Sequence, residues 1–156
     1  MITRLGNAGD FQAIVPMLRQ CRLRNQELDP GLYELHPDAE RRFHHWIGRM
    51  AENPRARLVV AEEDDRLIGF LYVTIEQDAP IFLHDEFALI REWWVDPAFE
   101  QIPAASEAMI VRMTGELASL GVRQIRAHTT AGDEDARQIF RRCGFRAGAC
   151  EMVREL

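Results

Sequence analysis

The sequence predicts an α/β protein in which a mixed β-sheet is flanked by helices. Apolar residues recur at helical spacing in some segments, and runs rich in β-branched and aromatic residues predict strands in others. The expected order is β-α-α-β-β-β-α-β-α-β. Because three strands follow one another between helices, we expect a mixed sheet rather than an all-parallel one. The chain has 156 residues, so we expect a single domain over residues 1–156.

The composition argues against several classes of partner. A net charge of −6 argues against a nucleic-acid-binding protein with a basic face. No apolar run approaches the ~20 residues of a membrane-spanning helix, so we expect no membrane partner. The three cysteines and five histidines show no metal-like spacing, so we expect no metal site. An odd number of cysteines indicates reduced thiols, and we therefore expect a cytoplasmic protein.

The first third of the chain predicts one short strand and two helices. Residues 2–5 alternate as a strand does. Asp10 is the expected N-cap of a helix with apolar residues at helical spacing, and Pro16 within it indicates a kink or a later start. The second helix is expected to begin at Pro37-Asp38 and to end at Asn53-Pro54.

A β-hairpin and a long strand follow. Residues 57–62 and residues 66–76 are rich in Val, Ile and Leu, and the polar turn of residues 63–65 joins them. Another strand is expected from about Glu86 to Val95. The sheet therefore gains three consecutive strands before the next helix.

The stretch from Arg91 to Arg112 organises the predicted fold. Its strand turns at Asp96-Pro97, passes a short polar loop and enters a helix that ends near Leu120, with Gly121 as its C-cap. The start of a helix carries N–H groups without partners and a partial positive charge. A strand that leads through a loop into a helix therefore predicts a place where an anion can bind.

The C-terminal part predicts a strand, a short helix and a last strand. Residues 122–129 are expected to form the strand and residues 133–143 the helix. Gly144 is expected to end this helix. The last strand is expected to begin at Phe145 and to run out at Val153.

Three motifs along the chain resemble those of one known family. They are LVVAE and RLIGFL at residues 58–62 and 66–71, WVDPAF at residues 94–99, and Asp133-x-x-Ala136-x-x-x-Phe140-x-x-x-Gly144-Phe145. In this order and spacing they are similar to the motifs of the GNAT N-acetyltransferases. The resemblance spans most of the chain. It implies the GNAT-type acyl-CoA N-acyltransferase fold, a splayed mixed sheet flanked by helices.

The resemblance also implies a reaction. Members of the family move an acetyl group from acetyl-CoA to an amine, so acetyl-CoA is the expected co-substrate, and an amine of a small molecule or peptide is the expected acceptor. The amine attacks the thioester directly. This step needs a base that deprotonates the acceptor ammonium and an acid that protonates the leaving thiolate. By resemblance, the pantetheine arm pairs with the strand of residues 90–95 and the pyrophosphate lies at the following helix start.

The residues expected to hold acetyl-CoA follow from that placement. They lie at the end of the strand, in the loop, at the helix start and at the beginning of the last helix: Trp94, Val95, Gln101, Ile102, Ala104, Ala105, Ser106 and Asp133. Glu92 on the central strand is the expected base, with Glu86 as the reserve. The alternative for Glu92 is a solvated glutamate or one paired with an arginine.

Other residues are candidates for the acceptor side. Trp93 and Trp94 must face opposite sides of their strand, so we expect one in the core and the other available to line a cleft. Residues 25–36, with Tyr33, occupy the region where the family often builds its acceptor site, and a plain surface loop is the alternative. Homodimers are common in the family, and residues 81–83 are a candidate exposed apolar patch for one.

The chain departs from the family pattern at the expected chemistry. In the loop, Glu100, Pro103 and Ala105 stand where the family has a basic or amide residue and two glycines. Phe140 stands where the family often has a tyrosine as general acid, so no residue is assigned to that role. The alternative function is therefore a GNAT-fold protein that has lost acetyl transfer and acts as a ligand-binding or protein-interaction module.

Overall fold

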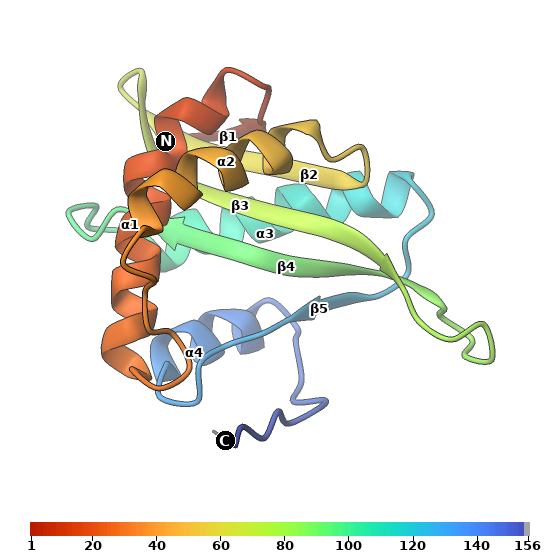
Figure 1. Ribbon diagram of the computed structural model, residues 1–156. Helices are drawn as coiled ribbons and strands as arrows, with labels where there is room; N and C mark the ends of the chain where they lie inside the picture. Colours follow the sequence, from red (N-terminus) through yellow and green to blue (C-terminus); the bar gives the residue numbers. More distant parts are fainter. Residues whose placement is uncertain (155–156) are drawn as a thin grey trace.

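The computed structural model describes residues 1–154, and within them a single five-stranded sheet is flanked by four helices (Figure 1). The strands are β1 (Ile2–Leu5), β2 (Ala56–Glu63), β3 (Arg66–Gln77), β4 (Glu86–Val95) and β5 (Ile125–Ala127). The helices are α1 (Asp10–Leu28), α2 (Ala39–Glu52), α3 (Ile102–Ser119) and α4 (Glu134–Arg142). Among these residues, no helix is long and apolar enough to cross a membrane.

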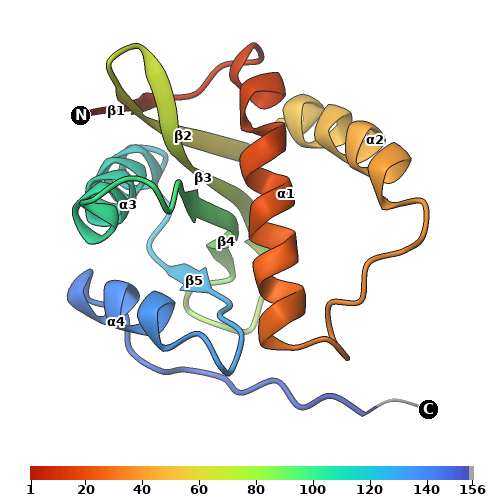
Figure 2. The ribbon, with the colours of Figure 1, turned by 90° about the vertical axis from the view of Figure 1, so that its left-hand side faces the viewer.

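The sheet is mixed, as the sequence predicted. Its spatial order is β1-β2-β3-β4-β5, with antiparallel neighbours from β1 to β4 and a parallel pair between β4 and β5. In Figure 2, α1 and α2 cover one face of the sheet, and α3 and α4 cover the other. The long helix that follows β4 provides the crossover that a parallel neighbour requires.

Both faces of the central strands are buried, which explains their continuous apolar runs. Val59 and Val60 are adjacent on β2 and both fully buried, yet Val59 packs in the core under α3 and α4 while Val60 packs in the core under α1 and α2. Leu71 and Tyr72 on β3 divide in the same way. Alternation along a strand thus supplies two separate cores.

The predicted hairpin is confirmed, and its turn has a defined local cause. Asp64 and Asp65 both have positive φ, at 50° and 59°. A two-residue loop of this kind matches the right-handed twist of the strands that it joins. Aspartate tolerates the left-handed region better than most residues because its short side chain can bond locally.

The start of α1 corrects one prediction. Asp10 is the first residue of the helix, and Gly9 is the N-cap. The Asp10 carboxylate instead accepts two hydrogen bonds from Arg4, each of 2.8 Å, and one of 2.7 Å from the N–H of Asn7. Because the Asp10 carboxylate binds Arg4 on β1, it does not cap the helix. Pro16 lies inside α1, and the helix extends from Asp10 to Leu28, so it does not begin after the proline.

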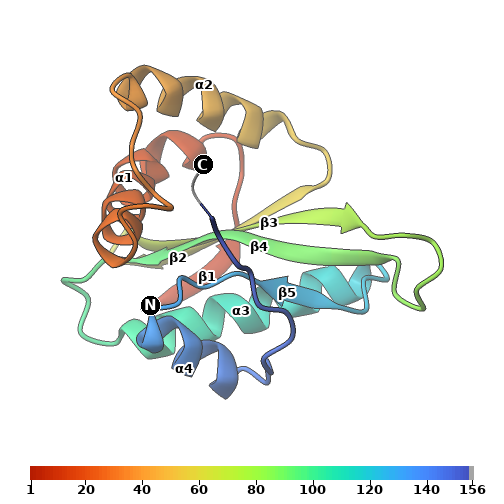
Figure 3. The same cartoon turned by 60° about the horizontal axis from the view of Figure 1, so that its bottom comes forward.

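The C-terminal predictions were only partly right. The strand expected over residues 122–129 is limited to β5, and the last strand, expected from Phe145 to Val153, was wrong because residues 145–154 have no regular structure. Figure 3 shows this segment leaving α4 as an irregular trace. Residues 146–154 are exposed, so no buried face fixes a strand register there.

Candidate active site

The sheet opens between β4 and β5. The two strands pair at Ala88–Ile125, Leu89–Arg126 and Ile90–Ala127, and within the described residues the pairing ends there. Residues 91–95 of β4 remain bonded only to β3 on their other side. Figure 1 shows the chain after β5 turning away from β4. The free edge of β4 therefore presents backbone N–H and C=O groups that an extended ligand can pair with.

A cleft of about 390 Å³ lies at this opening. Its walls are the second half of α1 and the loop after it, the free end of β4, the loop after β5, the beginning of α4 and the start of α3. The residues that line it include Cys21, Arg22, Arg24, Asn25, Tyr33, Arg91, Glu92, Trp93, Trp94, Val95, Ile102, Thr129, Asp133 and Phe140. Asn25 and Tyr33 come from the region proposed for the acceptor.

A β-bulge orients the side chains of β4. Tyr72 pairs with Glu92 and Val73 pairs with Ile90, so Arg91 is an extra residue on β4. Arg91 donates to Thr74 Oγ1 at 3.0 Å, and Glu92 lies opposite Tyr72, so both side chains are on the face covered by α1 and α2. The bulge therefore moves Glu92 away from the face of Ile90.

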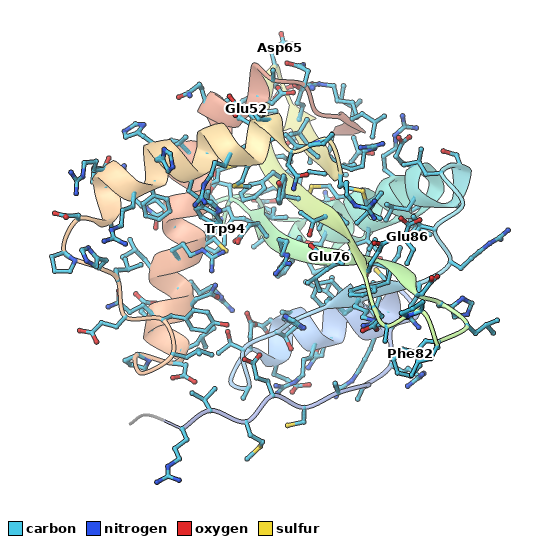
Figure 4. All side chains as sticks on the ribbon, turned by 45° about the vertical axis from the view of Figure 1, so that its right-hand side comes forward. Glu52, Asp65, Glu76, Phe82, Glu86 and Trp94 are labelled. Atoms are coloured by element: carbon cyan, nitrogen blue, oxygen red, sulfur yellow. The ribbon has the colours of Figure 1, made fainter. Side chains whose placement is uncertain are left out.

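Glu92 is buried and has an arginine partner. The residue is 5% exposed, and its carboxylate forms an ion pair with Arg22 of α1. The Arg22 guanidinium also lies over the ring of Trp46 on α2, at 5.1 Å from the ring centroid. Glu92 thus lines the cleft as a paired glutamate, and its role as a base remains a prediction. Glu86, the reserve base, lies at the other end of β4 and pairs with Arg55 at 2.7 Å (Figure 4).

The two tryptophans of β4 face opposite sides of the sheet, as predicted. Trp94 packs with the core under α1 and α2, as Figure 4 shows. Trp93 packs on Phe140 of α4, with ring centroids 5.8 Å apart. Both line the cleft. Phe140 also packs on Phe145 at 5.1 Å, so it fills the wall of the cleft with an aromatic ring that has no proton to donate.

The geometry at the start of α3 limits which N–H groups can donate a hydrogen bond to a phosphate. Pro103 lies in the first helical turn, where its missing N–H removes no helical hydrogen bond. The N–H of Ala105 donates to the carbonyl of Gln101 at 3.0 Å, and the Ser106 hydroxyl donates to the carbonyl of Ile102 at 2.8 Å. Ala105 and Ser106 are fully buried.

Of the helix-start residues expected to hold the pyrophosphate, Ile102 lines the cleft, whereas Gln101, Ala104, Ala105 and Ser106 do not. The expected contacts of these residues with acetyl-CoA stay predictions. The N–H groups of Ile102 and Ala104 belong to the first turn, which an α-helix leaves without internal acceptors. Gln101 is the exposed N-cap residue. Glu100 is exposed and does not line the cleft, so its carboxylate does not fill the space at the helix start.

Asp133 has a structural task at the edge of the cleft. Its carboxylate caps α4 by accepting the N–H of Ala136 at 3.1 Å. Arg24 of α1 reaches the same carboxylate at 3.3 Å and the Asp135 carboxylate at 3.7 Å. The second half of α1 is therefore linked to α4 across the cleft.

Sequence reasoning missed the contribution of α1. Cys21 of α1 is buried, and its Sγ lies 3.6 Å from the carbonyl oxygen of Trp93 on the free edge of β4. Burial raises the pKa of the Cys21 thiol, so the thiol keeps its proton at neutral pH. Arg22 and Arg24 carried no sequence signal. Their partners lie 70 or more residues away in the chain.

No metal centre is evident among the residues that the structure describes. Among residues 1–154, no group of three or more His, Cys, Asp or Glu side chains is arranged to hold a metal ion. The cleft instead combines an open strand edge, a helix start and a buried carboxylate. These features define an α/β protein suited to an extended ligand that ends in an anionic group.

Comparison with known families agrees with this geometry. The model of the Acetyltransferase (GNAT) family matches residues 18–145, and the chain belongs to this family. The comparison with curated protein sequences gives no match.

Solved structures show the same fold. The BH1408 protein from Bacillus halodurans, in a tetramutant form, has 13% identity and a TM-score of 0.81, with 100% of both chains covered. A predicted acetyltransferase with acetyl-CoA from Clostridium acetobutylicum has 13% identity and a TM-score of 0.78, covering 99% of this chain and 95% of the other. Ribosomal-protein-alanine N-acetyltransferase from Brucella melitensis has 14% identity, a TM-score of 0.71 and full coverage of both chains. At these identities the likeness concerns the fold.

Proposed function

We propose that the protein is an acetyl-CoA-dependent N-acetyltransferase whose acceptor is an amine of a small molecule or peptide. One observation carries the proposal: β4 loses its β5 partner after Ile90, and the free edge that follows borders a cleft. A pantetheine arm contains amide groups that can pair with such an edge in the way that a further strand does. Membership of the GNAT family supports this choice of co-substrate.

The pyrophosphate of acetyl-CoA fits the start of α3. The N–H groups of Ile102 and Ala104 and the helix dipole favour an anion there. In this proposal Gln101, an exposed residue, contributes its backbone N–H, Trp94 and Val95 supply the strand edge, and Asp133 borders the pantetheine arm. Ala105 and Ser106 act indirectly, since their buried positions hold the first turn of the helix in place.

The proposed reaction is direct attack. Glu92 removes a proton from the acceptor ammonium, directly or through a water molecule, and the amine nitrogen then attacks the thioester carbon. A C–N bond forms as the C–S bond breaks, the nitrogen gives up its second proton, and CoA leaves as a thiolate that takes up a proton. Phe140 cannot supply that proton, because its side chain has no ionisable group. In this proposal the protein assists the reaction through Glu92, which takes the proton, and through the edge of β4, which holds the co-substrate.

The setting of the protein is also a proposal. The three cysteines are free thiols, which supports a reducing compartment such as the cytoplasm. Ile81, Phe82 and Leu83 are 83%, 56% and 92% exposed in the loop between β3 and β4, and Figure 4 shows Phe82 in this loop. This patch supports a homodimer, which measurement of the molar mass in solution tests.

A second function is favoured by two specific features of the cleft. Glu92 is held by Arg22, and Phe140 lacks a hydroxyl. Both fit a GNAT-fold protein that binds a ligand or partner without transferring an acetyl group. The two functions differ in turnover: the enzyme acetylates an amine after it binds acetyl-CoA, whereas the binding module does not.

The decisive experiment is calorimetric titration with acetyl-CoA, followed by mass-spectrometric detection of acetylated amines. Thr129 lines the cleft, so Thr129→Trp is expected to fill the opening and to weaken acetyl-CoA binding by about tenfold or more. Thr114 is exposed on α3 outside the cleft, so Thr114→Trp is the matched control and should bind normally. Equal binding by both variants would exclude the cleft as the acetyl-CoA site. Binding without any acetylated amine would favour the second function.

A further inference from the structure

The groups around the Arg22 guanidinium are those that proteins use to bind a cationic ligand. Its guanidinium pairs with the buried carboxylate of Glu92 and lies over the ring of Trp46 at 5.1 Å. A carboxylate together with an aromatic face is a combination by which proteins also bind cationic ligands. The site therefore already contains a cation, which the chain itself supplies.

The carboxylate of Glu92 depends on such a partner. Its side chain is only 4% exposed, and a buried charge without a counterion is strongly unfavourable. Anything that reaches Glu92 must either leave Arg22 in place or bring a positive charge to replace it. A neutral amine cannot take the place of the guanidinium, because the exchange would leave the carboxylate without a counterion.

Arg22 is also placed so that it can be exchanged. It lines the cleft, and its side chain is 21% exposed, so the guanidinium can move toward solvent. The other two arginines of the cleft have their own carboxylates: Arg24 pairs with Asp133 and Asp135, and Arg91 pairs with Glu76 at 2.9 Å. An incoming cation that pairs with Glu92 therefore needs to displace Arg22 alone.

We propose that Arg22 is an internal occupant of the acceptor site and that the acceptor arrives as a cation that takes the place of its guanidinium on Glu92. This inference rests on the proposed acetyl transfer and specifies its acceptor class. The exchange keeps a counterion on Glu92 until the acceptor ammonium donates its proton to the carboxylate. The amine and the glutamic acid are then both neutral, and the amine nitrogen has the lone pair needed for attack.

The first test refills the site from solution. Arg22→Ala empties the position between Glu92 and Trp46, and methylguanidinium has the chemistry to occupy it. At fixed ionic strength, we expect millimolar methylguanidinium to raise the Tm of Arg22→Ala and to bind it about tenfold more tightly than it binds the natural protein. The thermal measurement remains informative when the variant is less stable.

Three further variants serve as controls. Arg22→Lys retains a tethered cation and should not gain binding. The double variant Arg22→Ala with Glu92→Gln lacks the carboxylate and should not bind methylguanidinium. Arg19→Ala removes an arginine one turn earlier on α1, whose partner Glu40 is 66% exposed, and should show no rescue because water already solvates that carboxylate. Equal affinity of methylguanidinium for the natural protein and Arg22→Ala overturns the proposal.

The second test measures acetyl transfer to 1,4-diaminobutane, a dication at neutral pH. We expect Arg22→Ala to lower its KM about tenfold, because the acceptor no longer competes with the tethered guanidinium. A raised KM would mean that Arg22 helps to bind the acceptor and would overturn the proposal. If acetyl-CoA does not bind the natural protein, the proposed function fails, while the methylguanidinium measurement still decides whether Arg22 occupies a cation site.

Discussion

Glu92 lies opposite Tyr72 across β4 and β3, although the next pair along the same strands joins Ile90 to Val73. Arg91 is the residue left over, and its insertion gives Glu92 and Trp94 a common face toward α1 and α2. Without this bulge the period of two would place Glu92 on the face of Ile90, under α3 and α4. The face of the sheet on which the proposed base lies is therefore a consequence of one extra residue.

Replacement of Glu92 by glutamine tests its role as the base. We expect Glu92→Gln to bind acetyl-CoA normally and to lose about 10²–10⁴ in kcat, because glutamine cannot accept the ammonium proton. The measurement is kcat across pH, in which the acidic limb set by the base should disappear. Glu76→Gln is the control, since Glu76 lies on the same sheet and pairs with Arg91 outside the proposed chemistry. An equal loss in both variants would contradict the assignment.

Gly69 of β3 is expected to be intolerant of a side chain. A Cβ at this position would lie 2.9 Å from the carbonyl oxygen of Trp94 and 3.2 Å from side-chain atoms of Val95 and Met109. Because the nearest atom is backbone, Gly69→Ala must shift the strand that borders the cleft. We expect a loss of about 1–3 kcal/mol in the free energy of unfolding and weaker acetyl-CoA binding.

Gly48 of α2 provides the matched control for that substitution. No atom lies within 4 Å of a Cβ built there, and the residue is exposed on the helix. Gly48→Ala should therefore raise the free energy of unfolding by about 0.5–1 kcal/mol, since alanine is the better helix former. Denaturant titration of both variants checks the opposite signs. A neutral Gly69→Ala would show that β3 and β4 can separate without cost.

The ion pair of Arg4 with Asp10 is expected to make the free energy of unfolding depend on pH in the acid range. Its hydrogen bonds hold the pKa of Asp10 below its usual range. A group whose pKa is depressed on folding stabilises the protein above its unfolded value, about 3.9 for aspartate, and that contribution is lost as the pH falls through the folded value. We expect Arg4→Met to cost about 1.5–3 kcal/mol at pH 7 and progressively less between pH 5 and pH 2.

The comparison for Arg4 is an exposed ion pair. Arg55 and Glu86 pair at 2.7 Å with side chains 48% and 43% exposed, so Arg55→Met should cost no more than about 1 kcal/mol. Denaturant titrations at several pH values measure both effects. A constant cost for Arg4→Met from pH 7 to pH 2 would show that the ionisation of Asp10 is not linked to folding.

Glu100 is expected to weaken the binding of a pyrophosphate at α3. Its carboxylate is exposed just before the helix start, so it repels an anion there without filling the cleft. Glu100→Gln should tighten acetyl-CoA binding by about two- to fivefold, the equivalent of about 0.3–1 kcal/mol. The gain should shrink as salt is added. Glu52→Gln, at the exposed end of α2, is the calorimetric control, and an equal gain there would indicate a general effect of net charge.

The sequence by itself predicted the features that depend on neighbours in the chain. Helical spacing located α1 to α4, the acidic turn at Asp64 and Asp65 located the hairpin, and Gly121 and Gly144, both at positive φ, followed two helices. The motifs at residues 58–71, 94–99 and 133–145 also led to the family. Such features can be recognised in a single sequence, because capping, turn formation and periodicity each depend on a few neighbouring residues.

Tertiary structure decided the contacts that join distant parts of the chain. The strand expected from Phe145 to Val153 does not form, and residues 146–154 are exposed. The Asp10 carboxylate binds Arg4 of β1 and does not cap the helix as expected. Arg22 and Glu92 are separated by 70 residues, and their pairing requires both the packing of α1 on the sheet and the bulge at Arg91. Local sequence patterns do not predict such pairings, because burial and charge complementarity arise only when the elements pack together.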